Sequence, residues 1–129
     1  MYAPLSVHEE KIGREVVDSA FKVHSQLGPG LLEKVYETCL VYELKKRNLQ
    51  VERQLAVPII YDGIVMDEGF RADIVVEALV IVELKAVLEM HPVYTAQILS
   101  HMRLLNKRLG YLINFHVPKI KDGIHRFVK

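Results

Sequence analysis

The pentapeptide Ile-Val-Glu-Leu-Lys at residues 81–85 (IVELK) decides how this chain is interpreted. It places a carboxylate and an ammonium in a run that otherwise predicts a buried strand. Residues 70–77 (FRADIVVE) resemble it, and their Asp73 stands ten positions before Glu83. Charged side chains in core strands cost free energy unless they are paired or coordinate a metal. The two strands therefore raise the question of whether the chain is an enzyme.

The turn between these strands determines whether their charges share a face. With a three-residue turn at residues 77–79, Asp73 lies opposite Glu83 and Arg71 lies opposite Lys85 on the same face of a hairpin. A two-residue turn shifts the register by one and puts the carboxylates on different faces. The three-residue turn predicts a patch of two carboxylates and two cations at the end of the hairpin.

Two carboxylates that face each other repel unless a cation lies between them. Mg²⁺ or Mn²⁺ suits such a pair, because hard cations take one or two carboxylates together with waters and phosphate oxygens. A metal there activates water and neutralises charge on a phosphate, and Lys85 points to the same side as Glu83. The alternative is a ladder of cross-strand ion pairs, which individually stabilise a sheet very little.

The composition predicts one α/β domain over residues 1–129. Half of the residues are hydrophobic and 26% are charged, which excludes a disordered chain. The net charge of +1 shows no overall basic excess, and the single Cys39 excludes an internal disulfide. No apolar run is long enough for a signal peptide or a bilayer span, so we expect a cytoplasmic protein with no membrane contact.

Helical periodicity predicts two helices before the strands and one after them. A capping box at residues 6–9 begins the first helix, and Gly-Pro-Gly at 28–30 ends it. The second follows over 31–48, and the third begins near Pro92. The positions expected to face the core are Ile12, Val16, Ala20, Val23 and Leu27 in the first helix, Leu32, Val35, Cys39 and Tyr42 in the second, and Tyr94, Ile98, Met102, Leu105 and Leu109 in the third.

Strands are predicted over residues 51–61, 64–77, 80–87 and 110–117, with a short last strand over 123–128 at the sheet edge. In the second strand, Phe70, Ala72, Ile74 and Val76 are expected on one face. The third strand alternates in the same way, with Glu83 and Lys85 on one side. The predicted fold is a central mixed β-sheet flanked by helices, in the order helix, helix, three strands, helix, strand.

Several motifs in this order resemble the PD-(D/E)XK nuclease superfamily, whose core is restriction-endonuclease-like. The pattern Asp-x₉-Glu-Leu-Lys on consecutive strands carries the resemblance. More narrowly, residues 30–36 (GLLEKVY) are similar to the naming motif of the GxxExxY family within that superfamily. Residues 96–106 (AQILSHMRLLN) and 110–128 also look like that family, so the resemblance runs from about Ile12 to the C-terminus.

The resemblance implies a metal-dependent nuclease. By position, Asp73 and Glu83 would bind Mg²⁺ or Mn²⁺, and Lys85 would be the catalytic lysine. Glu33 would supply a further acidic ligand from the first core helix. The alternative for Glu33 is a charge that stabilises the N-terminus of its own helix.

The remaining candidates surround this set. Gln97 matches the catalytic glutamine of a Q-x-x-x-Y helix motif found in part of the superfamily, but His101 stands where that motif has tyrosine. His101 can still hydrogen-bond a phosphate or Gln97. Arg71 is a candidate phosphate clamp. Tyr36, one helical turn after Glu33, is expected either to contact the substrate or to pack in the core.

The expected partner is therefore a nucleic acid, with DNA as the expected substrate. The small surface of one domain also suggests a homodimer. The alternative function is an inactive nuclease-like binding or assembly module. In the enzyme, the acidic side chains and Lys85 converge in one cleft, whereas in the module they pair with Arg71 and neighbouring cations.

Overall fold

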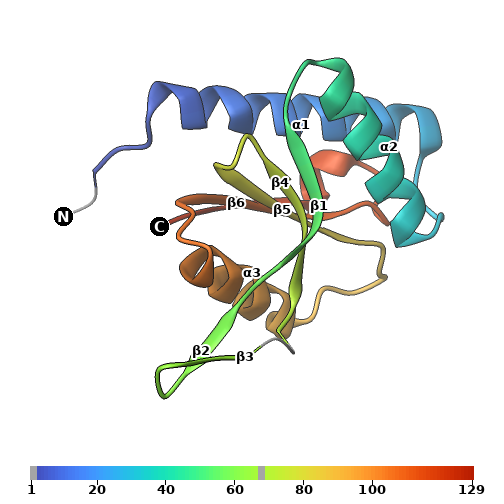
Figure 1. Cartoon of the computed structure of the whole chain (residues 1–129). Coiled ribbons are helices and arrows are strands. Elements are labelled where there is room, and N and C mark those ends of the chain that lie inside the picture. Colours follow the sequence, from blue (N-terminus) through green and yellow to red (C-terminus); the bar gives the residue numbers. More distant parts are fainter. Residues whose placement is uncertain (1–2, 67–68) are drawn as a thin grey trace.

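A five-stranded mixed sheet forms the centre of the computed structural model, which describes residues 3–66 and 69–129 (Figure 1). Its order is β1-β4-β5-β6-β7, in which β5 and β6 are parallel and the other neighbours antiparallel. The strands are β1 (Val51–Ala56), β4 (Arg71–Val76), β5 (Val80–Lys85), β6 (Leu109–Asn114) and β7 (Ile124–Val128). A 3₁₀ turn, η1 (Ile120–Gly123), leads into β7. The predicted mixed sheet and its last edge strand are confirmed.

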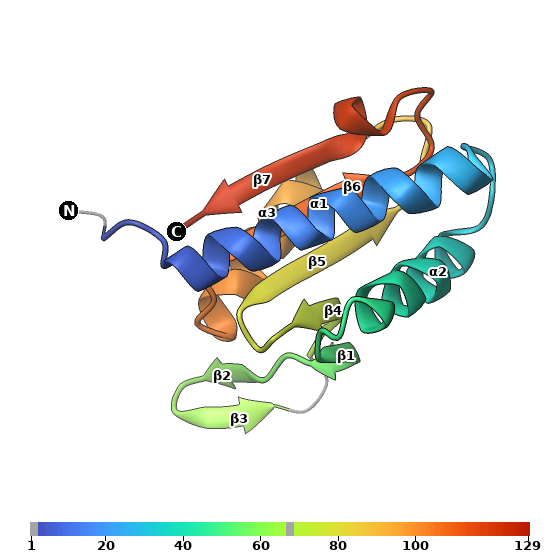
Figure 2. The same cartoon turned by 90° about the horizontal axis from the view of Figure 1, so that it is seen from above.

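Helices cover both faces of this sheet. α1 (Val7–Leu27) and α2 (Glu33–Lys46) lie on one face, and α3 (Pro92–Leu104) lies on the other (Figures 1 and 2). The predicted capping box begins α1, because Ser6 Oγ accepts from the Glu9 N–H while Glu9 accepts from the Ser6 N–H. Within the described ranges, no helix is both long and apolar enough to cross a bilayer.

A separate two-stranded ribbon, β2 (Ile59–Tyr61) with β3 (Ile64–Met66), projects from the sheet (Figure 1). Its turn is Asp62-Gly63, both with positive φ, as predicted. The long strands expected over 51–61 and 64–77 are wrong, because each is divided between the sheet and this ribbon. Asp67 and Glu68, which fall in the second of them, lie outside the described residues.

The core between the sheet and the first two helices confirms one predicted helix face and corrects another. The α1 positions are buried except Leu27, which is exposed. On α2 the buried apolar side chains are Tyr36, Leu40, Val41 and Leu44, whereas three of the four predicted positions are exposed and Cys39 is only partly buried. The α2 sequence is apolar on more than one side, and the stacking of Tyr36 on Phe115 fixes which side faces inward.

A second, smaller core lies between the sheet and α3. Ile98 and Met102 pack there as predicted, but Leu109 is the first residue of β6 rather than part of the helix. Ala72 also packs in this cluster, whereas Ile74 and Val76 pack in the larger core. The expectation that Ala72 shares a face with them is therefore wrong. The β4 strand changes its facing at Asp73, and that irregularity creates the site.

The hairpin of β4 and β5 has the three-residue turn that brings the two carboxylates together. Its paired residues are Val76 with Val80, Val75 with Ile81 and Ile74 with Val82. In the turn, Glu77 and Ala78 both have left-handed backbone angles. Continuing this register places Asp73 opposite Glu83, so the predicted register is confirmed.

Candidate active site

The ladder between β4 and β5 stops at Ile74 and Val82, and two carboxylates fill the gap beyond it. The Asp73 N–H donates to Glu83 Oε2 at 3.1 Å, and the Leu84 N–H donates to Asp73 Oδ2 at 2.8 Å. Each carboxylate thus satisfies a backbone donor of the opposite strand, which would otherwise be left without a partner. This exchange explains how core strands accommodate Asp73 and Glu83.

The two carboxylates open onto a cavity of about 180 Å³ beside α3. Lys85 lies on the same side of β5 as Glu83 and lines the same cavity, as the alternation predicted. The lining side chains are Phe70, Arg71, Asp73, Glu83, Lys85, Tyr94, Gln97, His101 and Leu112. Four further residues that the sequence marks as candidates, from two strands and a helix, therefore meet beside the carboxylate pair: Arg71, Lys85, Gln97 and His101.

The electrostatics of the pair are unfavourable without a cation. Burial, and then the neighbouring charge of Glu83, raise the pKa of Asp73 from 3.8 to about 7, although the hydrogen bond from Leu84 opposes the shift. Glu83 itself is only 7% exposed. In the described part of the chain, no ion pair joins either carboxylate to Arg71 or Lys85. The cross-strand ladder expected for a purely structural role is therefore not formed.

The cations near the pair have other contacts. The Lys85 ammonium lies 4.4 Å from the centre of the Tyr94 ring, a cation–π arrangement that holds its charge at the cavity wall. Arg71 is exposed and donates through Nη1 to the backbone oxygen of Gln54 at 3.0 Å. Both side chains line the cavity and leave the carboxylates accessible to another cation.

His101 reaches the pair from α3. Its Nδ1 is hydrogen-bonded to Glu83 Oε1, and the side chain is almost fully buried. Its other ring nitrogen, Nε2, has no hydrogen-bond partner within the described residues. His101 therefore orients Glu83, and it makes no hydrogen bond with Gln97, which was one of the two partners expected for it.

Gln54 belongs to this site although the sequence does not indicate it. It has a left-handed backbone (φ 51°) inside β1, opposite Asp73. Its Nε2 donates to Asp73 Oδ1 at 3.3 Å and to Glu37 Oε1 at 2.9 Å, and Arg53 pairs with Glu37 at 2.8 Å. Strained backbone of this kind in a strand is retained where surrounding contacts fix it. Nothing in the residue type or its neighbours signals this conformation.

A comparison with protein-family models identifies the family of the chain that carries this site. Residues 10–127 match the model described as the PD-(D/E)XK nuclease superfamily. The chain belongs to this superfamily. No curated protein and no solved structure gives a match. Membership in the PD-(D/E)XK nuclease superfamily implies phosphodiester hydrolysis, a nucleic acid as substrate and the use of divalent metal ions.

The PD-(D/E)XK carboxylates of this chain fit such an ion. Asp73 and Glu83 offer four hard oxygen donors, and each oxygen accepts one hydrogen bond, which leaves a lone pair free. Mg²⁺ commonly uses only one or two carboxylates and keeps several waters. A bound cation would also favour the charged form of Asp73, whose pKa is otherwise raised to about 7.

Glu33, the predicted third carboxylate, does not line the cavity that holds this pair. Across residues 3–66 and 69–129, no three His, Cys, Asp or Glu side chains are grouped closely enough to hold a metal ion. Glu33 is the first residue of α2 and lines a neighbouring groove with Glu37 and Gln54. Burial raises its pKa, and the charge of Lys85 opposes that shift, so Glu33 contributes negative charge near the site from outside the cavity.

Of the two alternatives expected for Tyr36, packing in the core is the one that the structure shows. Its side chain is fully buried and stacks on Phe115 with ring centres 4.6 Å apart. Its hydroxyl donates to the Gly28 oxygen at 2.6 Å and accepts from the Leu31 N–H at 3.1 Å. Tyr36 therefore fixes the turn between α1 and α2 and the start of the helix that carries Glu33.

Proposed function

We propose that this chain is a metal-dependent nuclease that hydrolyses phosphodiester bonds at the Asp73–Glu83 pair, with DNA as the expected substrate. The observation that carries the proposal is a buried pair of carboxylates that opens onto a cavity and, among the described residues, forms no ion pair with the Lys85 or Arg71 that line it, while the pKa of Asp73 is raised to about 7. Without a metal, the burial and mutual repulsion of the two carboxylates cost stability, as the raised pKa of Asp73 indicates. Sites of this kind are retained for function.

The residues of the cavity suit distinct parts of the reaction. Asp73 and Glu83 would hold Mg²⁺ or Mn²⁺, which when bound supplies charge neutralisation on the phosphate and lowers the pKa of water. Lys85 would orient the attacking water through the ammonium that Tyr94 holds at the wall, or, as the neutral amine, receive the proton of that water. Gln97 would hydrogen-bond the water or a phosphate oxygen. Arg71 would bind a neighbouring phosphate through its guanidinium.

His101 and Gln54 would position the carboxylates rather than touch the scissile bond. His101 holds one oxygen of Glu83, and Gln54 holds one oxygen of Asp73.

The finer assignment to the GxxExxY family rests on residues 30–36, in which Tyr36 holds the helix start. We also propose that two copies associate to bind a substrate longer than one domain spans. Light scattering at several concentrations tests the association.

The test is cleavage of labelled single- and double-stranded DNA and RNA with Mg²⁺ or Mn²⁺. We expect cleavage of DNA that EDTA abolishes and that Lys85→Met lowers by about 100-fold or more, the usual contribution of a positioned acid–base group. Lys121→Met is the matched control, because Lys121 is exposed on η1, outside the cavity. No cleavage of any substrate, or full activity in Lys85→Met, would contradict the proposal.

A further inference from the structure

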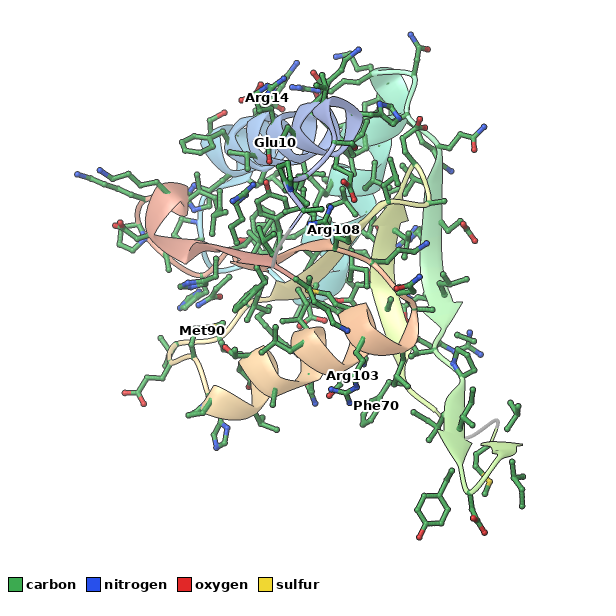
Figure 3. All side chains as sticks on the ribbon, turned by 90° about the vertical axis from the view of Figure 1, so that its left-hand side faces the viewer. Glu10, Arg14, Phe70, Met90, Arg103 and Arg108 are labelled. Atoms are coloured by element: carbon green, nitrogen blue, oxygen red, sulfur yellow. The ribbon has the colours of Figure 1, made fainter. Side chains whose placement is uncertain are left out.

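A second hollow adjoins the catalytic cavity. It is a groove of about 370 Å³ between the β2–β3 ribbon and α3, and it shares Phe70, Gln97 and His101 with the cavity. Figure 3 shows Phe70 and Arg103 side by side where α3 faces the ribbon. The Phe70 ring packs at a tilt against His101, with centres 5.6 Å apart. Phe70 thus stands at the boundary between the groove and the carboxylate pair.

The walls of this groove combine an aromatic face with polar edges. Ile60 is 63% exposed and Phe70 is 59% exposed, so the groove presents apolar surface to solvent. Gln97 and Ser100 supply hydrogen-bonding groups along one side, and Arg103 supplies a cation at the rim. Of the described residues that line the groove, none is acidic. This chemistry suits a planar, polar-edged ring that is attached to a phosphate.

We propose that the groove binds an unpaired nucleobase next to the scissile phosphate, with Phe70 as the stacking platform. This inference rests on the proposed nuclease function. The base and phosphate of one nucleotide are joined through its sugar, so a phosphate at the carboxylate pair brings a neighbouring base to the groove. A base inside a duplex is stacked on both sides and cannot present a face to Phe70. The substrate is therefore single-stranded or unpaired at the cleavage site.

The ribbon offers a second apolar surface, which serves as an internal control. Tyr61 is 72% exposed on the same ribbon but does not line the groove. The described ribbon residues include one acid, Asp62, and no cation, so the ribbon alone has nothing to attract phosphate. If nucleic acid bound unspecifically to the exposed apolar surface of the ribbon, Tyr61 would matter as much as Phe70. In the proposed site, only Phe70 matters for nucleic-acid binding.

The experiment is a binding titration with short oligodeoxynucleotides that carry one fluorescent adenine analogue, placed at each position in turn. It is run on the wild type in EDTA, where no cleavage occurs, and on Lys85→Met with Mg²⁺, where cleavage is slow compared with the titration. We expect quenching at one or two positions of the single strand and none in the matching duplex. Phe70→Ala should weaken binding about 5- to 150-fold, the range for loss of one stacked base. Phe70→Tyr should restore quenching, and Tyr61→Ala should leave binding unchanged.

The inference is overturned by equal binding of single strand and duplex, by the absence of binding under both conditions, or by equal losses in Phe70→Ala and Tyr61→Ala. These outcomes are separate from the fate of the proposed function. Position-specific quenching in a protein that cleaves nothing would keep the base site and reject the nuclease. Cleavage that is equal on duplex and single strand, and insensitive to Phe70→Ala, would keep the nuclease and reject the base site.

Discussion

Replacing Asp73 by asparagine should stabilise the metal-free protein at alkaline pH. The pKa of Asp73 rises from 3.8 to about 7 on folding, chiefly through burial and the charge of Glu83. A raised carboxyl pKa means that the unfolded chain releases the proton near pH 3.8, whereas the folded chain holds it until about pH 7. Stability is therefore lost as pH rises through this window and stays low above it.

The magnitude follows from the size of the shift. About three pKa units correspond to about 4 kcal/mol of free energy of unfolding at pH 8.5. The shift is shared with Glu83, and asparagine keeps only one of the two hydrogen bonds to Asp73, at a loss of about 1 kcal/mol. We therefore expect Asp73→Asn to be about 2–3 kcal/mol more stable than the wild type at pH 8.5. Near pH 4 the Asp73 carboxyl of the folded wild type is protonated, so the cost of burying its charge no longer contributes to the difference in stability between the two proteins.

Urea unfolding in EDTA at both pH values measures this difference. Asp62→Asn is the matched control, because Asp62 is an exposed turn residue whose left-handed backbone asparagine also accepts. Added Mn²⁺ should stabilise the wild type by about 2.7 kcal/mol at one hundred times its dissociation constant, and leave Asp73→Asn unchanged. A variant that is less stable at pH 8.5, or a difference that does not depend on pH, would refute this reasoning.

Three further substitutions test the surroundings of the pair. Gln54→Gly removes the strain of the left-handed backbone, so the free energy of unfolding should be unchanged or higher by up to about 1 kcal/mol. Calorimetry should record weaker Mn²⁺ binding, because Asp73 loses its hydrogen bond from Gln54. His101→Leu leaves the buried Glu83 carboxylate with one partner fewer, so the free energy of unfolding in urea should fall by about 2–4 kcal/mol above neutral pH. An unchanged unfolding midpoint would contradict the positioning role of His101. Tyr36→Phe should cost about 1–2 kcal/mol through its two lost hydrogen bonds and leave Mn²⁺ affinity as it is.

Local patterns in the sequence predict the carboxylate pair well. The alternation along residues 80–85 places Glu83 and Lys85 on one side of β5, and the three-residue turn fixes the register opposite Asp73. These features depend only on the two-residue period of a strand and on turn length, which a single sequence contains. The approach of His101 and Gln97 from α3 follows from the helix that begins at Pro92.

Features that depend on long-range contacts are not predictable in the same way. The buried side of α2 is decided by the stacking of Tyr36 on Phe115, about eighty residues away in the sequence. The left-handed backbone of Gln54 is held by side chains from α2 and β4, and glutamine has no local preference that would reveal it. The ribbon divides two predicted strands because the chain leaves the sheet after β1, which the apolar pattern does not mark.

The separation of Glu33 from the pair has a similar origin. Its position in the first turn of α2 was predictable, but its distance from Asp73 depends on how α2 crosses the sheet. Gln54 hydrogen-bonds both Glu37 of α2 and Asp73, so it links the helix that carries Glu33 to the carboxylate pair. Sequence motifs name the residues of such a site, and the packing of helix on sheet determines which of them meet.

Calorimetric titration of Mn²⁺ tests the central claim most directly, because the whole account depends on a cation at Asp73 and Glu83. The titration compares the wild type with Asp73→Asn, Glu83→Gln, Glu33→Gln and the control Asp62→Asn. We predict one site in the wild type and in Asp62→Asn, no measurable binding in Asp73→Asn and Glu83→Gln, and at most a modest loss in Glu33→Gln. Equal binding in all five proteins, or none in the wild type even with a single-stranded oligonucleotide present, would contradict the account.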